Sequence, residues 1–103
     1  MADQRLNKLA RLLVNYSTKV KPGDFVFVSC DEVARPWMVE VVKEAIKAGA
    51  HVETQLTSTE VSEVQLKYSS EDQLLSENVI FKTMLEKADV WISAWASRNT
   101  KGF

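Results

Sequence analysis

Two stretches of the chain are continuously apolar, and each is only as long as a β-strand. They are residues 25–30, FVFVSC, and residues 90–96, VWISAWA. A strand that is apolar at consecutive positions is covered on both faces, which is typical of the parallel sheets of α/β proteins. Because parallel neighbours are joined by crossovers of a dozen or more residues, this feature predicts helices between the strands.

The segments around these strands carry helical periodicity. Their apolar spacing predicts helices over residues 4–20, 34–48 and 74–87. Residues 50–56 alternate more and predict a second, less covered strand. The residues expected on the buried faces of the helices are Leu6, Leu9, Ala10, Leu13 and Tyr16 or Ser17 in the first, Met38, Val41, Val42, Ala45 and Ile46 in the second, and Ile80, Phe81, Met84, Leu85 and Ala88 in the last.

Turn-forming residues separate these elements. Residues 21–24, KPGD, end the first helix, because proline resists helix continuation and glycine accepts a positive φ. Pro36 suits the first turn of the second helix, where its missing N–H has no partner to lose. Gly49 is placed to end that helix in the left-handed conformation.

Residues 57–76 carry two possible helix starts. Thr57 with Glu60, and Ser70 with Gln73, have the spacing of capping boxes. We therefore expect further helical structure between the second strand and the helix over residues 74–87.

The order of elements predicts an α/β fold. Right-handed crossovers favour strand order 2-1-3 with residues 25–30 in the middle, as in half of a doubly wound, mostly parallel, three-layer sheet. The apolar strand at residues 90–96 would then lie at an edge, where natural proteins avoid exposed apolar strands. We therefore expect residues 1–103 to be an incomplete sheet, the N-terminal α/β domain, or its first part, of a larger protein. A small complete domain is the alternative.

Composition narrows the class of protein. The chain has 103 residues, a net charge of −1 and one cysteine, so we expect one domain, no internal disulfide and no nucleic-acid partner. Its apolar stretches are far shorter than the ~20 residues that cross a bilayer. No signal peptide is visible, so the Asn15-Tyr16-Ser17 sequon is interpreted as chance. We expect a cytoplasmic protein without a membrane partner.

Few residues of this chain suggest catalysis, nucleotide binding or metal binding. No glycine-rich phosphate loop is present, and His51 lies in a strand without a nucleophile elbow. Cys30, Asp31 and Glu32 follow the first strand, on the side where open α/β sheets bind ligands. Acidic neighbours raise the pKa of a thiol, and no histidine is near in sequence to complete a metal site. We interpret them as a buried cysteine followed by a polar loop.

The tryptophans are better explained by packing. Trp37, Trp91 and Trp95 lack the interleaved basic residues of a nucleic-acid stacking surface, so we place them in the core or at a domain interface. Arg98 and Lys101 belong to an ordinary polar segment. The residues themselves support no catalytic, cofactor-binding or metal-binding assignment.

Four segments resemble one protein family in order and spacing. They are residues 9–17, LARLLVNYS, with residues 20–24, VKPGD; residues 43–52, KEAIKAGAHV; and residues 86–92, EKADVWI, followed by residues 99–101, NTK. Together they resemble the N-terminal region of the thermophilic-type metallo-aminopeptidases, the family of aminopeptidases T and S and of PepS.

The resemblance implies a catalytic function whose metal-binding residues lie outside this chain. Family members are much longer, form dimers and have an N-terminal α/β domain and a C-terminal catalytic domain. A pair of divalent cations (Zn, Co or Mg), held by side chains of the later domain, activates the water that attacks the N-terminal peptide bond. None of the family's metal ligands maps onto residues 1–103.

The resemblance therefore leads us to expect a domain of a peptide-hydrolysing, homodimeric aminopeptidase, inactive by itself. A related branch contains a ring-cleaving dihydroxypyridine dioxygenase. The alternative is a complete, non-enzymatic α/β binding or dimerisation module.

Overall fold

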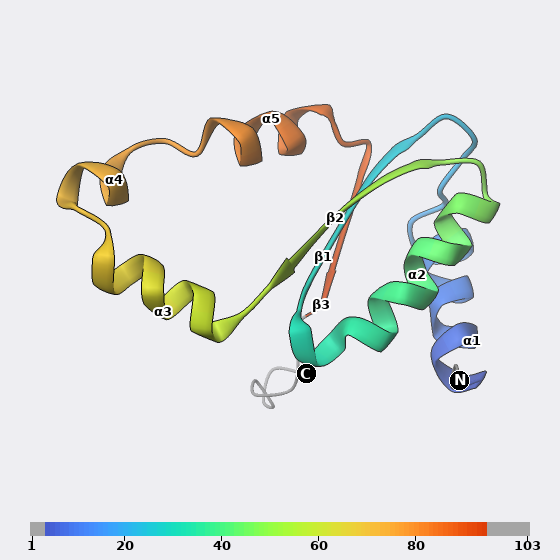
Figure 1. Ribbon diagram of the computed structural model, residues 1–103. Coiled ribbons are helices and arrows are strands. Elements are labelled where there is room, and N and C mark those ends of the chain that lie inside the picture. The colour runs from blue at the N-terminus through green and yellow to red at the C-terminus, as the bar shows by residue number, and fades with distance from the viewer. Residues whose placement is uncertain (1–3, 95–103) are drawn as a thin grey trace.

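A computed structural model describes residues 4–94 (Figure 1). Its elements, in chain order, are α1 (Gln4–Leu12), the π-helical segment η1 (Leu13–Ser17), β1 (Phe25–Asp31), the 3₁₀ turn η2 (Glu32–Ala34), α2 (Arg35–Lys47), β2 (His51–Thr57), α3 (Thr59–Tyr68), α4 (Glu71–Leu75), α5 (Val79–Lys87) and β3 (Val90–Ala94).

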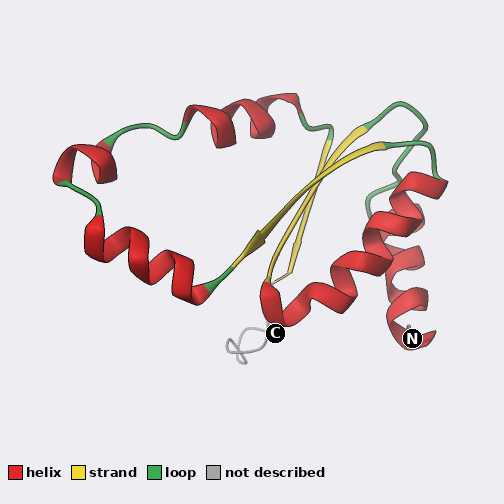
Figure 2. Ribbon diagram, in the orientation of Figure 1, coloured by secondary structure: helices red, strands yellow, loops and turns green. Residues whose placement is uncertain are grey.

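The three strands form one parallel sheet in the order β2-β1-β3, which confirms the predicted α/β fold and topology. In register, Val26 of the central strand lies between Val52 of β2 and Val90 of β3. Helices α1 and α2 lie to one side of the sheet, and the segment from α3 to α5 lies to the other (Figure 2). Among residues 4–94, no helix has the length and apolarity needed to cross a membrane.

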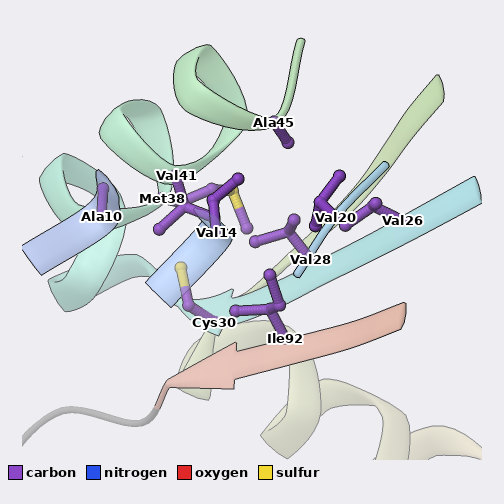
Figure 3. Close-up of a cluster of buried hydrophobic side chains, with 10 residues drawn as sticks. All are labelled: Ala10, Val14, Val20, Val26, Val28, Cys30, Met38, Val41, Ala45 and Ile92. Atoms are coloured by element: carbon purple, nitrogen blue, oxygen red, sulfur yellow. The ribbon is translucent and has the colours of Figure 1, made fainter. Parts of the chain in front are cut away.

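The main core fills the space between the sheet and the first two helices. Figure 3 shows how side chains of β1 meet those of α2, with Ile92 contributed by β3. Its members are Ala10, Val14, Val20, Val26, Val28, Cys30, Met38, Val41, Ala45 and Ile92. Successive residues of β1 are buried, as its continuous apolar run predicted, because Phe27 packs on the opposite face against Phe81 of α5.

The first helix departs from prediction in its second half. Residues 13–17 form a wider π-helical turn, which changes which positions face the core. Val14 is buried there, whereas Tyr16, expected on the buried face, is exposed. Leu9 was also expected on that face and is exposed, although it lies within α1 before the π-helical turn. The chain then leaves the helix through Lys19, whose φ is 51°.

The buried face of α2 was predicted only in part. Met38, Val41 and Ala45 are buried as expected, but Ile46 is exposed. Glu40 and Glu44 are buried instead, with 4% and 6% of their surface exposed, because α1 packs across them.

The segment after β2 is more divided than its apolar spacing predicted. Ser58, not Thr57, caps α3 by accepting a hydrogen bond from the Val61 N–H. The predicted capping box of Ser70 and Gln73 is present in both directions at the start of α4. The single helix expected over residues 74–87 is wrong, because Asn78 caps a separate helix, α5, by accepting from the Phe81 N–H.

Candidate functional site

Open α/β sheets bind ligands at the carboxyl ends of their strands. At this end of β1, polar side chains form hydrogen bonds with backbone groups. One carboxylate oxygen of Asp31 accepts hydrogen bonds from the N–H groups of Val33 and Ala34, both at 3.1 Å. The Thr57 hydroxyl, at the end of β2, donates to the Cys30 carbonyl at 3.3 Å. Within the described residues, this edge therefore starts η2 and α2 and brings no reactive side chains together.

Cys30 points into the core and not toward this edge (Figure 3). Burial, and secondarily the neighbouring Asp31 carboxylate, raise the pKa of the Cys30 thiol. A raised pKa lowers the thiolate fraction that a nucleophile or metal ligand needs. Glu32 is exposed and lies within η2. The structure thus agrees with the interpretation of these residues as a buried cysteine and a polar turn.

His51 is exposed at the first position of β2. Its ring stacks on Phe25 of the neighbouring strand, with ring centroids 5.0 Å apart. Its backbone N–H donates to the Asp24 carbonyl at 2.8 Å. The imidazole is therefore placed by strand pairing, at the opposite end of the sheet from Cys30 and Asp31.

A shallow apolar groove of about 340 Å³ lies beside His51, between the amino-terminal halves of β1 and β2 and the end of α5. Its lining residues are Phe25, Val26, Phe27, His51, Val52, Glu53, Met84, Lys87 and Ala88. The sequence does not predict this groove, because the residues that line it come from segments as far apart along the chain as β2 and α5. The groove opens at the amino ends of the strands, away from the ligand-binding edge of such sheets.

The tryptophans have packing roles where they are described. Trp37 packs against the main core. Trp91 joins Phe27 and Phe81 in an aromatic cluster under α5, with ring centroids 6.0–6.2 Å apart. Trp95, Arg98 and Lys101 lie outside the described residues.

A charged cluster that the sequence analysis missed joins α1 to α2. The Asn7 amide donates to Glu40 at 2.8 Å and to Glu44 at 3.2 Å. Lys43 pairs with Glu40 at 2.9 Å, and Lys47 with Glu44 at 3.6 Å. Spacing of carboxylates and lysines along one helix would have suggested such pairs, but not their burial, which depends on α1.

The donor atoms needed for a metal centre do not come together in residues 4–94. No three His, Cys, Asp or Glu side chains there are placed to hold an ion. A catalytic zinc site uses about three protein ligands. The described residues therefore do not fit a catalytic metal, and no reaction step is derived from them.

Comparison with known proteins decides the family. The family model of the thermophilic metalloproteases (M29) matches residues 2–103. The chain belongs to this family. The resemblance found in the sequence is thereby confirmed.

A solved structure, wild-type AmpT from Thermus thermophilus, shares the fold of this M29 chain. The match has a TM-score of 0.69 at 19% sequence identity and covers 82% of this chain and 22% of that one. The chain thus spans only about a fifth of the length of AmpT. No curated protein matches it.

Proposed function

We propose that residues 1–103 are the N-terminal α/β domain, or the first part of it, of a two-domain, metal-dependent aminopeptidase. The observation that carries the proposal is the M29 family match over residues 2–103. The full protein would remove N-terminal residues from peptides, using divalent cations (Zn, Co or Mg) held outside this chain. This family membership favours a peptidase domain over a non-enzymatic binding module.

The chemistry of the described residues supports a non-catalytic role for this domain. Its ligand-binding edge has Asp31 and Thr57 engaged with the backbone, and Cys30 is buried. A domain with such an edge supplies shape and substrate access, while a second domain supplies the ligands. We extend the proposal to a cytoplasmic, homodimeric enzyme.

Hydrolysis of an aminoacyl p-nitroanilide tests this proposal. The chain alone, supplied with Zn²⁺, Co²⁺ or Mg²⁺, is expected to show no turnover. The polypeptide extended along the same reading frame beyond Phe103 is expected to hydrolyse the substrate, and a chelator is expected to abolish that activity. Metal-dependent turnover by residues 1–103 alone would place the chemistry inside this chain and overturn the proposal.

A further inference from the structure

The apolar groove beside His51 has the size of a small-ligand site. Its volume of about 340 Å³ lies at the lower end of the ~300–1,000 Å³ that such sites occupy. Phe25 and Phe27 form its base, because side chains two positions apart on β1 point to the same face of the sheet. In register, His51 and Glu53 of β2 lie beside them on one side, and the end of α5 closes the other.

Backbone hydrogen bonds hold the sides of this groove in place. The Asp89 N–H donates to the Phe25 carbonyl at 2.7 Å, and the Phe25 N–H donates to the Asp89 carboxylate at 2.8 Å. These two bonds fix the end of α5 against β1. The bond from the His51 N–H to the Asp24 carbonyl fixes the start of β2 in the same way. A site that is already formed loses less free energy to ordering when a ligand binds.

The groove carries one acidic and one basic side chain on opposite sides. Glu53 belongs to β2, and Lys87 is the last residue of α5. Within residues 4–94, neither of them forms an ion pair, with the other or with any third residue. A ligand that carries a positive and a negative charge on one apolar body would pair with both, because complementary charge selects the partner.

The apolar part of the groove suits an aromatic or large aliphatic group. The His51 and Phe25 rings stack at an interplanar angle of 24°, and aromatic rings pack favourably against such faces. Met84, on the side of α5, adds an adaptable thioether. We propose that the groove binds a free α-amino acid with a large apolar side chain, its carboxylate paired with Lys87 and its ammonium group with Glu53. This inference does not depend on peptidase activity.

Ligand-observed saturation-transfer NMR with a matched set of probes tests the site on residues 1–103. L-Phenylalanine carries the apolar body and both charges, phenethylamine lacks the carboxylate, 3-phenylpropionate lacks the ammonium group and glycine lacks the apolar body. L-Phenylalanine should bind saturably with a Kd of roughly 1 mM, as befits so small a ligand in an open groove. Each probe that lacks one charge should bind about 2–5-fold more weakly, and glycine should not bind.

Variants of the two charged residues assign each contact. Lys87→Gln should bind L-phenylalanine no more tightly than phenethylamine, and Glu53→Gln no more tightly than 3-phenylpropionate. The controls Lys82→Gln and Glu86→Gln each remove one charge from α5 outside the groove and should keep the wild-type order of affinities. Circular dichroism verifies that every variant folds. Absence of saturable binding by the wild-type chain, or variants that discriminate among the probes as wild type does, overturns the proposal.

The polypeptide extended beyond Phe103 tests whether the groove stays open in a longer chain. The binding to be compared there is the part that Lys87→Gln removes, because a catalytic centre elsewhere could also take an amino acid but would not respond to Lys87. We expect this part to persist. Its loss in the extended polypeptide would show that later residues fill the groove, and would overturn the proposal.

Discussion

At the residue scale, the stability of this fold depends on a few positions where surrounding atoms or backbone conformation make substitution unfavourable. Gly49 is the clearest, since it follows the last turn of α2 with a φ of +94° and its N–H donates to the Ile46 carbonyl at 2.9 Å. The Gly23 N–H donates to the Gly49 carbonyl at 3.0 Å, which ties the end of α2 to the turn before β1. The predicted role of Gly49 is confirmed.

Gly49→Ala is expected to destabilise the chain more than Gly23→Ala. Both glycines have positive φ, which costs about 1–2 kcal/mol for an L-residue. At Gly49 the new Cβ would also lie 3.0 Å from the Cα and Cβ of Pro22, whereas at Gly23 it would meet no atom within 4 Å. Urea unfolding measures both free energies, and equal losses would contradict the account.

Glu40 is expected to make stability depend on pH. Hydrogen bonds from Lys43 and then Asn7 hold the pKa of this carboxyl below its usual value of 4.5. A lowered native pKa stabilises the fold above the unfolded value, and the contribution is lost as pH falls through the native value. Glu40→Gln should therefore lower the free energy of unfolding at neutral pH and converge with wild type once the pH falls below the lowered native pKa of Glu40.

The matched control for Glu40 is Glu86→Gln, on the exposed surface of α5. It removes one carboxylate without touching the Asn7 cluster, so its effect on unfolding should be small at every pH. A Glu40→Gln difference that persists unchanged in acid would show that the carboxylate acts through shape and not through charge.

At the element scale, the connection between β1 and α2 shows how a strand end is converted into a helix start. Asp31 is the last residue of the strand and also the cap of η2. Pro36 follows in the first turn of α2, as predicted. The element boundary is therefore set by one carboxylate and one proline.

Removing the Asp31 carboxylate should destabilise this junction. Asp31→Ala leaves the N–H groups of Val33 and Ala34 without their acceptor, which typically costs about 0.5–2 kcal/mol. Asp31→Asn keeps an acceptor oxygen and should lose much less. Denaturant unfolding of the two variants distinguishes a capping role from a charge effect, since a charge effect would make them equally unstable.

Structural features set by neighbouring residues could be predicted from the sequence, whereas features that depend on packing between distant segments could not. The capping box of Ser70 and Gln73 was predicted because both residues lie within one turn. The break at Asn78 was missed because apolar spacing continues through it. Burial of Glu40 depends on Asn7, which is 33 positions away and outside the pattern of α2.

The same limit applies to the candidate site. Cys30 and Asp31 were placed correctly at the end of β1, since a continuous apolar run shows where a central strand stops. The groove beside His51 and the pairing of His51 with Phe25 were not predicted, because they arise from strand register. Register in a parallel sheet is set by tertiary packing of both faces.

At the scale of the whole molecule, the described residues form an open parallel sheet with one well-packed face. The segment over residues 57–77, after β2, projects from this sheet (Figure 1). The main core lies between β1, β3, α1 and α2, and the other face is covered mainly at the aromatic cluster under α5. The scaffold belongs to the family of thermophilic metalloproteases (M29). We propose that the described residues, 4–94, supply no metal site of their own, and this is the central claim.

Isothermal titration of the folded chain with Zn²⁺ and with Co²⁺ tests that claim most directly. We expect no saturable binding at a stoichiometry near one, because no three donor side chains converge within residues 4–94. The extended polypeptide should bind the same ions under the same conditions. Tight, stoichiometric binding by residues 1–103 alone would contradict the account.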